Sequence, residues 1–383
     1  MWVLGLMSGT SADGVDGVLA EFQGSPSRPR WRVAQASSIP YPDDLRTQLI
    51  RYGQGHPLPA AAVLDLVEHL TEVQAQAARA CDPHGRAERV GCHGQTLWHR
   101  PPEEGRAGAS WQALMGPSLA ERLGRPVVFD FRAADLALGG QGAPLVPATD
   151  TALLGGIGGW RAVLNLGGIA NLTLIPPGQG PDRDRPVRGW DCGPANTLID
   201  LAVHQFSEGR LRFDQEGCWA RQGRIDEAVI ATWLQEPYLC QPPPKSTGRE
   251  LFGAEDLERR LGGLRGQDNQ VSPADALATL TAFSAAAVAQ DLRHGPLPIE
   301  LLVAGGGTRN TFLMEQLRRR CRGVVVRPLS ELGIGDLERE ALAFALLAWW
   351  HALGHPGSFP SVTGARSSAV LGLCASPASR LGS

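Results

Sequence analysis

Lysine is almost missing from this sequence of 383 residues, because 35 of its 36 basic residues are arginine. Such a bias follows from genome composition and by itself says nothing about function. The single lysine, Lys245, is of interest because a compact ammonium can occupy a crowded site that a planar guanidinium cannot. It stands in the motif PPPKSTGRE, where a functional role and a chance position on a surface loop are both open.

Long apolar runs and blocks of like charge are missing as well. The longest apolar stretch, residues 341–353, is shorter than the ~20 residues that a membrane-spanning helix needs, so it predicts a buried helix. A net charge of −3 gives no basic field that would favour nucleic acid. The apolar residues 2–7 break at Ser8, before the core of a signal peptide could form. We therefore expect a cytoplasmic protein that binds neither membranes nor nucleic acids.

Cysteine pairs with metal-binding spacing do not occur. The seven cysteines form an odd number and contain no C-x-x-C motif, which argues against a disulfide framework and against a structural zinc site. We expect reduced thiols, as in a cytosolic enzyme.

Neither G-x-x-x-x-G-K-[ST] nor a G-x-G-x-x-G that opens a helix occurs in the chain. Instead GLMSGTSADGVDG, residues 5–17, joins two apolar strands and predicts a hairpin. Turn preferences explain two or three of its small polar residues, not all of them. The N–H groups and hydroxyls of such a loop suit a phosphate, and Asp13 and Asp16 could hold Mg²⁺. The residues that we expect to bind nucleotide here are Gly9, Thr10, Ser11, Ala12, Asp13, Gly14, Val15 and Asp16.

Two further glycine loops follow apolar strands. AVLNLGGIANLTLI, residues 162–175, repeats the hairpin design and indicates a second domain related to the first. LLVAGGGTRNTFLMEQL, residues 301–317, leads from a strand into a helix and leaves a flat backbone surface for a base and ribose. The nucleotide-binding candidates in these loops are Gly167, Gly168, Gly305, Gly306, Gly307 and Asn310.

Strands and helices alternate in both halves, which predicts an α/β fold with a cleft between two domains. GGQGAPLVPATD, residues 139–150, is rich in glycine and proline and suits a domain crossover. We expect an N-terminal domain of residues 1–145 and a C-terminal, nucleotide-binding domain of residues 146–383. The last long helix, expected to open at Asp336, can pack across their interface.

Asp191, in GWDCGPANTLID, precedes a helix that we expect to begin near Pro194. An aspartate there is often only a helix cap, but the helix terminus would also keep its carboxylate ionised. An ionised carboxylate in a cleft can deprotonate water or a hydroxyl beside a phosphoryl donor. The residues alone leave both interpretations open.

A second polar group lies at expected strand ends in GCHGQTLWH and FDFRAAD. A lone histidine is more often structural than catalytic. Glutamine, aspartate and arginine together suit a polyhydroxy ligand with an acidic group, because arginine can bind a carboxylate through two parallel bonds. The polar residues that cluster there are His93, Gln95, Asp130, Arg132 and Asp135.

Together these motifs resemble the anhydro-N-acetylmuramic acid kinases of the actin-like sugar kinase/Hsp70 superfamily. The resemblance covers nearly the whole chain and rests on segments in the family's order: MSGTSADGVD, CHGQT, DFRAADLALGGQGAPLVP, NLGGIANLT, DCGPAN, PKSTGRE, GGGTRN, EALAFA and VTGA. It implies two actin/RNase H-like domains that flank a nucleotide and sugar cleft, and a homodimer. It also implies an ATP-dependent enzyme that opens the 1,6-anhydro bridge of anhydro-N-acetylmuramic acid with water and phosphorylates O6. The products would be N-acetylmuramic acid 6-phosphate and ADP, in bacterial peptidoglycan recycling.

For single residues, the resemblance implies that Asp191 activates the attacking water and that Gly9 to Asp16 contact ATP and Mg²⁺. The loops at Gly167 and Gly305 would close on the phosphates and the adenosine. The candidates for the sugar pocket are His93, Gln95, Asp130, Arg132, Lys245 and Glu340.

The chain departs from the family's pattern at Ala12, where a larger apolar residue is usual, at Phe129, where a small residue is, and at Ala195, where glycine is common. If the turn at Ala195 needs a positive φ, alanine costs about 1 kcal/mol there. Other functions stay open: a sugar kinase that phosphorylates a free hydroxyl without hydrolysis, or an actin-like ATP-driven binding protein. The latter would need an additional peptide-binding domain, which is not visible. A glycosidase without ATP would leave the three glycine loops without a purpose.

Overall fold

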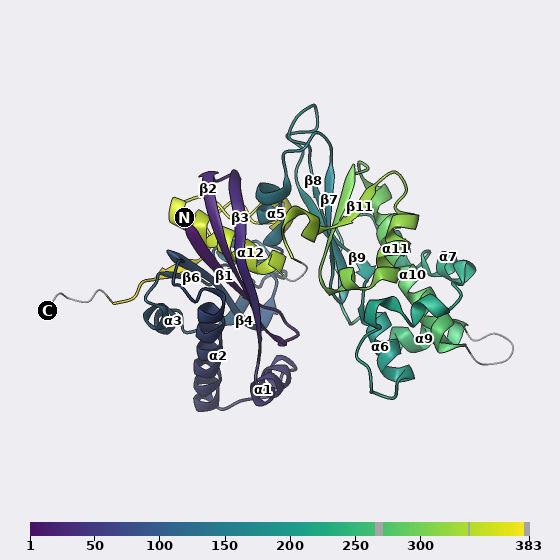
Figure 1. The fold of residues 1–383 in the computed structure, drawn as a ribbon, viewed down its shortest axis with the longest axis horizontal. Helices are drawn as coiled ribbons and strands as arrows, with labels where there is room; N and C mark the ends of the chain where they lie inside the picture. Colours follow the sequence, from purple (N-terminus) through teal and green to yellow (C-terminus); the bar gives the residue numbers. More distant parts are fainter. Residues whose placement is uncertain (265–270, 336–337, 379–383) are drawn as a thin grey trace. The chain divides into compact units, whose positions relative to one another are not determined.

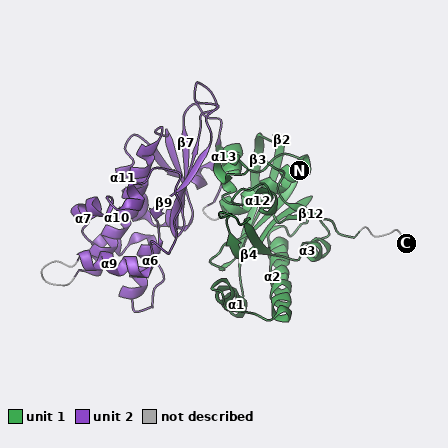
Figure 2. Ribbon diagram, turned by 180° about the vertical axis from the view of Figure 1, so that it is seen from behind, with its two compact units in different colours: residues 1–154, 337–383 green, residues 155–336 purple. Residues whose placement is uncertain are grey.

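The structure, a computed structural model, describes residues 1–264, 271–335 and 338–378 (Figure 1). It divides into two compact units: unit 1 comprises residues 1–154 and 337–383, and unit 2 comprises residues 155–336 (Figure 2). Within the described ranges, every helix is too short or too polar to span a membrane.

This division differs from the expected domains, 1–145 and 146–383, in two places: unit 1 runs to residue 154, and it also takes the C-terminal segment. Helix α12, Glu338–Leu353, packs on the sheet of unit 1, and its Arg339 forms a buried ion pair with Asp150 of α5 (Val146–Leu154). A helix that is apolar nearly all round must be covered by apolar partners, and this sheet supplies them. The C-terminal segment therefore belongs to unit 1. Asp336, the expected start of this helix, lies outside the described residues.

Unit 1 is built on a sheet with the strand order β12-β6-β4-β1-β2-β3, and β5 pairs with β4. Its strands are β1 Trp2–Ser8, β2 Gly14–Ser25, β3 Arg28–Pro40, β4 Arg89–Arg100, β5 Ala109–Ala113, β6 Val127–Phe129 and β12 Leu373–Ala375. Its helices besides α5 and α12 are α1 Asp43–Gly53, α2 Ala60–Cys81, α3 Gly116–Leu123, α4 Ala133–Ala137 and α13 Pro360–Thr363.

Unit 2 is built on a sheet with the order β11-β10-β7-β8-β9. Its strands are β7 Arg161–Leu166, β8 Ile169–Ile175, β9 Arg188–Pro194, β10 Glu300–Ala304 and β11 Val325–Pro328. Its α-helices are α6 Thr197–Phe206, α7 Glu227–Trp233, α8 Pro237–Cys240, α9 Ala254–Leu264, α10 Pro273–Asp291 and α11 Thr311–Arg320. Short 3₁₀ turns are η1 Gln215–Gly217, η2 Ala220–Gln222, η3 Leu292–His294, η4 Gly306–Arg309 and η5 Leu329–Leu332.

The two sheets follow one plan. In unit 1, β1, β2 and β3 form an antiparallel meander, β4 runs parallel to β1, and β6 runs parallel to β4. In unit 2, β7, β8 and β9 form the meander, β10 runs parallel to β7, and β11 runs parallel to β10. Each expected hairpin is the first turn of its meander. The predicted fold class, α/β with two related domains, is confirmed.

Alternation along β1 separates the two faces of the first sheet. Leu4 and Leu6 pack in one core with Leu66 and Leu70 of α2. Gly5, between them, points to the opposite face, where α12 lies. Since successive strand residues point to opposite faces, α2 and α12 cover the two sides of the sheet.

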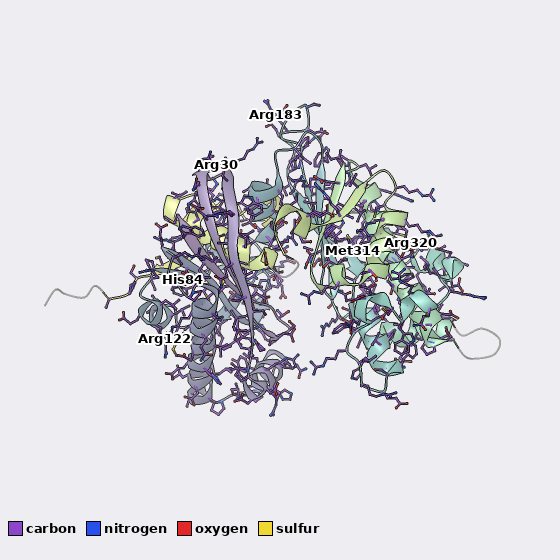
Figure 3. The ribbon with its side chains drawn as sticks, in the orientation of Figure 1. Arg30, His84, Arg122, Arg183, Met314 and Arg320 are labelled. Carbon is purple, nitrogen blue, oxygen red and sulfur yellow. The ribbon has the colours of Figure 1, made fainter. Side chains whose placement is uncertain are left out.

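In unit 2, α10 and α11 cover one face of the sheet. Leu164 of β7 packs with Val288 of α10 and with Met314 of α11, which is labelled in Figure 3. Helix α10 begins at Pro273, and the side chain of Ser272 caps it by accepting a bond from the N–H of Asp275.

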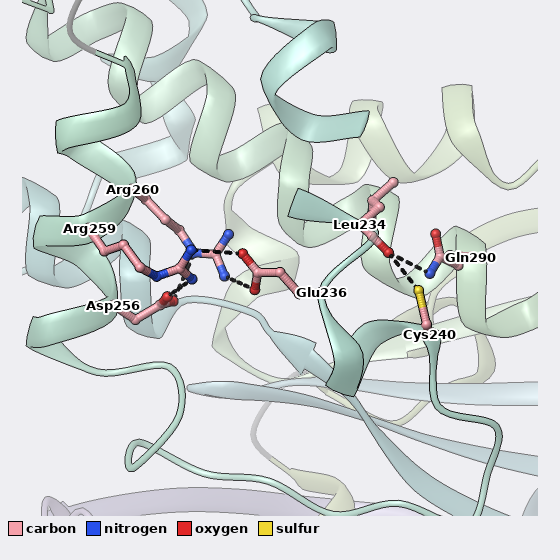
Figure 4. Close-up of polar contacts among 7 residues, drawn as sticks. All are labelled: Leu234, Glu236, Cys240, Asp256, Arg259, Arg260 and Gln290. Carbon is pink, nitrogen blue, oxygen red and sulfur yellow. Dashed lines mark hydrogen bonds and ion pairs between the residues drawn. The ribbon is translucent and has the colours of Figure 1, made fainter. Parts of the chain in front are cut away.

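A second core in unit 2 lies between α10 and the helices α6, α7 and α9. Arg260 is fully buried there and is held by Asp256 at 2.8 Å and Glu236 at 2.7 Å (Figure 4). Its guanidinium also lies over the rings of Trp233 and Phe283. A buried cation needs such partners, because an unpaired charge in this core would be strongly destabilising.

Glycines let the backbone of α12 lie directly on the first sheet. A Cβ atom on Gly5 would come within 1.9 Å of the carbonyl oxygen of Ala341, and one on Gly91 within 2.2 Å of that of Phe344. Both are contacts with backbone, so a side-chain rotation cannot relieve them.

We expect Gly91→Ala to lower the free energy of unfolding by at least about 2 kcal/mol, because α12 must move away from β4. Urea unfolding followed by circular dichroism measures this. The control is Gly53→Ala at the end of α1, where a Cβ meets no atom within 4 Å. Equal stability of the two variants would contradict the close approach of helix and sheet.

Candidate active site

The first hairpin loop of unit 1 is held by Gln95 of β4. Ser8 donates a hydrogen bond to Oε1 of Gln95 at 2.6 Å, and Nε2 of Gln95 donates to the carbonyl oxygen of Gly9 at 3.1 Å. Ala12 is buried at φ 51°, in the left-handed region that side chains rarely adopt. The loop is therefore fixed in shape on both sides of Gly9.

Acidic side chains gather beside this loop. Asp13 is exposed and pairs with Arg46 at 2.9 Å. Burial raises the pKa of Asp16, and the charge of Asp13 adds to this rise. Burial also raises the pKa of Glu340 on α12, to which the charge of Asp16 contributes. Like charges held together in this way favour a bound cation.

Magnesium fits these donors in chemistry, because it binds through one or two carboxylates and keeps several waters. Asp13 and Asp16 are such carboxylates; burial raises the pKa of Asp16, a hydrogen bond from Ser38 opposes this rise, and the charge of Asp13 adds to it. In the described part of the chain, no cluster of three or more His, Cys, Asp or Glu side chains is arranged to enclose a metal ion.

His93 orients Arg132. Nδ1 of His93 lies 2.9 Å from the carbonyl oxygen of Gly94, which can only accept, so Nδ1 carries the proton. Nε2 then accepts from Nη2 of Arg132 at 3.0 Å, and Nη1 of Arg132 donates to the carbonyl oxygen of Gly142 at 2.7 Å. Nε of Arg132 is buried and has no partner among the described residues. Asp130 stands nearby in sequence at φ 55°, and burial raises its pKa.

In unit 2, the hairpin loop of β7 and β8 is tied to the segment before α6. Asn196 donates from Nδ2 to the carbonyl oxygen of Gly167 at 2.7 Å, and the N–H groups of Ala195 and Thr197 donate to Gly168. The hydroxyl of Thr197 is buried without a partner among the described residues, and a Cβ on Gly168 would lie 2.7 Å from it. Sequence analysis missed the roles of Asn196 and Thr197, although both lie within the motif GWDCGPANTLID that contains Asp191.

The third glycine loop lies against the end of β7. Cβ atoms on Gly305 and Gly307 would both come within 2.9 Å of Leu166, whereas one on Gly306 would meet no atom within 4 Å. Gly306 thus presents an open backbone surface. Asn310 caps α11, because its side chain accepts from the N–H of the helix's third residue at 2.9 Å.

The helix predicted to begin near Pro194 is present but begins three residues later. The helix α6 begins at Thr197, and Asp191 lies within β9, paired with Asn171 of β8 beside a β-bulge. Pro194 is the last residue of strand β9 and lies before the start of α6. Asp191 is therefore not the residue that directly precedes α6.

The carboxylate of Asp191 is bound on one side. Its Oδ2 accepts from the hydroxyl of Ser246 at 2.8 Å and from the N–H of Thr247 at 3.0 Å. No hydrogen bond to Oδ1 occurs among the described residues. Burial raises the pKa of Asp191, while the bonds from Thr247 and Ser246 lower it and the charge of Glu250 raises it further. Sequence analysis missed Ser246 and Thr247, which follow Lys245 in the PKSTGRE motif.

Lys245 does not lie on the surface. Its side chain is 1% exposed, and its ammonium pairs with Asp291 of α10 at 2.8 Å. It also donates to the carbonyl oxygen of Tyr238 at 3.3 Å and lies 4.9 Å from the centre of that residue's ring.

The departures from the family pattern fit the fold. Ala195 is not among the residues with positive φ, so the expected cost does not arise; Gly193 takes that conformation instead, at φ 146°. Phe129 packs on the core of unit 1, where a Cβ on Gly116 would lie 2.4 Å from its ring.

Burial, with a contribution from the charge of Arg132, lowers the pKa of His93 from 6.5 to about 3. Below the unfolded pKa the unfolded chain binds a proton that the folded chain does not, so stability falls as the pH falls from about 7 towards 3. We expect His93→Gln to remove about 2 kcal/mol of the stability difference between about pH 7 and pH 5. Urea unfolding at the two pH values measures it. The same pH dependence in both proteins would contradict a neutral, buried His93.

Comparison with known proteins identifies the family of the chain. The family model described as anhydro-N-acetylmuramic acid kinase matches residues 1–377. The anhydro-N-acetylmuramic acid kinase of Synechococcus sp. (strain CC9902) is 61% identical over 98% of this chain and 100% of its own length. That of Prochlorococcus marinus (strain MIT 9303) is 62% identical over 99% and 100%. A solved structure, (R)-2-hydroxyglutaryl-CoA dehydratase component A of Acidaminococcus fermentans, is 12% identical over 92% of this chain and 99% of its own, with a TM-score of 0.44. The chain belongs to the anhydro-N-acetylmuramic acid kinase family.

Proposed function

We propose that this chain is an ATP-dependent kinase that opens the 1,6-anhydro bridge of anhydro-N-acetylmuramic acid with water and phosphorylates O6. The products are N-acetylmuramic acid 6-phosphate and ADP, and the reaction serves peptidoglycan recycling. The names of its relatives support the sugar substrate. The observation that carries the proposal is the carboxylate of Asp191, with Oδ2 bound and Oδ1 without a bond among the described residues.

Asp191 acts as the general base. Because Ser246 and Thr247 fix Oδ2, the other oxygen has a defined direction in which to accept a proton from water. The water oxygen attacks C1, the bond from C1 to O6 breaks, and O6 takes the γ-phosphoryl group of ATP. A pKa raised by burial makes Asp191 a stronger base than an exposed aspartate.

The phosphates are bound by the hairpin loops. Each loop offers N–H groups from glycine and small residues, and Thr197 adds a buried hydroxyl beside Gly168. Asp13 and Asp16 would hold Mg²⁺, which neutralises phosphate charge when bound. The open backbone at Gly306 supports the adenosine contact.

The sugar is bound in part by unit 1. Arg132, held by His93, keeps its positive charge for an acidic substituent of the sugar. Gln95, Asp130 and Glu340 complete the proposed sugar contacts of this unit. All seven cysteines are free, which supports action in the cytoplasm, and the resemblance supports a homodimer.

We expect Asp191→Asn to abolish product formation while ATP still binds, because the amide keeps the shape but cannot accept the proton of water. The assay uses ATP, Mg²⁺ and the anhydro-sugar in ¹⁸O-labelled water, with mass spectrometry of the product and nucleotide binding by calorimetry. The control is Asp184→Asn, an exposed aspartate with the same change. Near-normal turnover of Asp191→Asn would refute the role of the base.

The same assay separates the alternatives. Wild-type product with ¹⁸O at C1 is expected, whereas product without it would indicate a sugar kinase that uses a free hydroxyl. Rapid ATP hydrolysis without any anhydro-sugar would instead indicate an ATP-driven binding protein.

We expect Asp13→Ala to raise the Mg²⁺ concentration needed for half-maximal activity about 10-fold, because one carboxylate near the metal is lost. Asp44→Ala removes the same charge from an exposed position of helix α1 and serves as the control. An unchanged Mg²⁺ dependence of Asp13→Ala would count against a metal at this loop.

A further inference from the structure

A buried ion pair lies directly behind Asp191. Lys245 and Asp291 are each 1% exposed, and their charged atoms are 2.8 Å apart. The second oxygen of Asp291 accepts from the indole N–H of Trp190 at 3.0 Å. Trp190 is the neighbour of Asp191 in β9, and its side chain points to the opposite face of the sheet from that of Asp191. The pair is therefore placed under the strand that carries the proposed base.

Lys245 connects this pair to Asp191 through its own backbone. β9 is the last strand of its sheet, and the N–H of Asp191 donates to the carbonyl oxygen of Lys245 at 3.1 Å. The next two residues, Ser246 and Thr247, then bind Oδ2 of Asp191. The segment thus wraps the free edge of the strand, with its ammonium on the buried face and its two donors at the carboxylate.

Tyr238 of α8 closes the arrangement. Its hydroxyl donates to the carbonyl oxygen of Asp191 at 2.8 Å, and its own carbonyl oxygen accepts from Lys245. Gln290 of α10 fixes α8 by donating to the carbonyl oxygens of Leu234 and Leu239 (Figure 4 shows the contact with Leu234). The ammonium is thus held by the carboxylate of Asp291 on α10 and by the carbonyl oxygen and ring of Tyr238 on α8.

We infer that Lys245 is a positioning residue: its pairing with Asp291 holds residues 245–247 on the edge of β9, so that Ser246 and Thr247 fix the carboxylate of Asp191. This assigns Lys245 a role other than the expected direct contact with the sugar, and it rests on the proposed function of Asp191. A buried ion pair costs desolvation and is often no more stable than an apolar pair, so a directional role accounts better for its presence here. The compact ammonium suits a site that encloses it fully.

The test compares Lys245→Met, which keeps the length of the side chain, with Ser246→Ala, which deletes one bond to Oδ2. Initial rates of ADP and sugar-phosphate formation are measured between about pH 5 and pH 9. We expect Lys245→Met to lower kcat at least about 10-fold with both KM values within about threefold. In this variant the acidic limb of the plot of kcat against pH moves to higher pH. The bonds from Ser246 and Thr247 stabilise the ionised form of Asp191, and the variant loses them. Ser246→Ala moves the limb in the same direction, and the double variant moves it no further than Lys245→Met.

Arg161→Met controls for loss of a buried cation. Arg161 pairs with Glu300 at the start of β7 and is also largely buried. Its variant is expected to lose stability while the acidic limb keeps its position. The other titratable groups that face Asp191 among the described residues, Glu250, Tyr238 and Cys192, are unchanged in all of these variants. If Lys245→Met does not fold, Asp291→Asn weakens the same pair with little change of shape and should move the limb likewise.

Three results would overturn the inference: a higher KM for the sugar with an unchanged kcat and limb, which indicates direct contact; shifts that add in the double variant; or the same shift in Arg161→Met. Failure of the proposed function is seen separately. Turnover by Asp191→Asn would refute Asp191 as the general base. An inactive Asp191→Asn together with an unaffected Lys245→Met would refute only the positioning role of Lys245.

Discussion

The free edge of β9 is the constraint on which the proposed chemistry depends. An edge strand leaves backbone N–H and C=O groups unpaired, and a protein must satisfy them in another way. Here the N–H of Asp191 binds Lys245 and its C=O binds Tyr238, so the edge is closed by side elements rather than by another strand. The bulge next to Asp191 adds a local bend, as bulges beside functional sites often do. The same segment, residues 245–247, thus binds the free edge of β9 and orients the carboxylate of Asp191.

The two hairpin loops are held by the same device. In unit 1 the amide of Gln95 donates to the carbonyl oxygen of Gly9, and in unit 2 the amide of Asn196 donates to that of Gly167. Each amide occupies one carbonyl oxygen of its loop, and the glycines and small residues of the loop also carry N–H groups that a ligand can approach. An anion is the ligand that such groups attract. The repeated sheet plan therefore carries a repeated loop chemistry, although the two amides come from different positions in their units.

Local patterns predicted the hairpins and the glycine loops, because these depend on neighbours in sequence. The course of β9 through Pro194 was not predicted, since pairing with β8 outweighs the local helix signal. The burial of Lys245 depends on Asp291, 46 residues away, which no local pattern reveals. For the same reason α12 was assigned to the second domain: nothing in residues 341–353 indicates which sheet they cover. Long-range packing decided each of these features.

The two cationic side chains of the predicted sugar pocket, Arg132 and Lys245, have partners of different charge, and electrostatics explains the difference. Arg132 is oriented by a neutral imidazole, so its position is fixed while its charge is not cancelled by that contact. Lys245 is paired with a carboxylate, which cancels most of its field. An uncancelled ammonium behind Asp191 would lower the pKa of that carboxyl and weaken it as a base. A ligand-binding arginine gains from keeping its charge, whereas a cation that only positions a base must be neutralised. The hydrogen-bond partners of the two residues follow that distinction, and the charge of Glu340 also acts on Arg132.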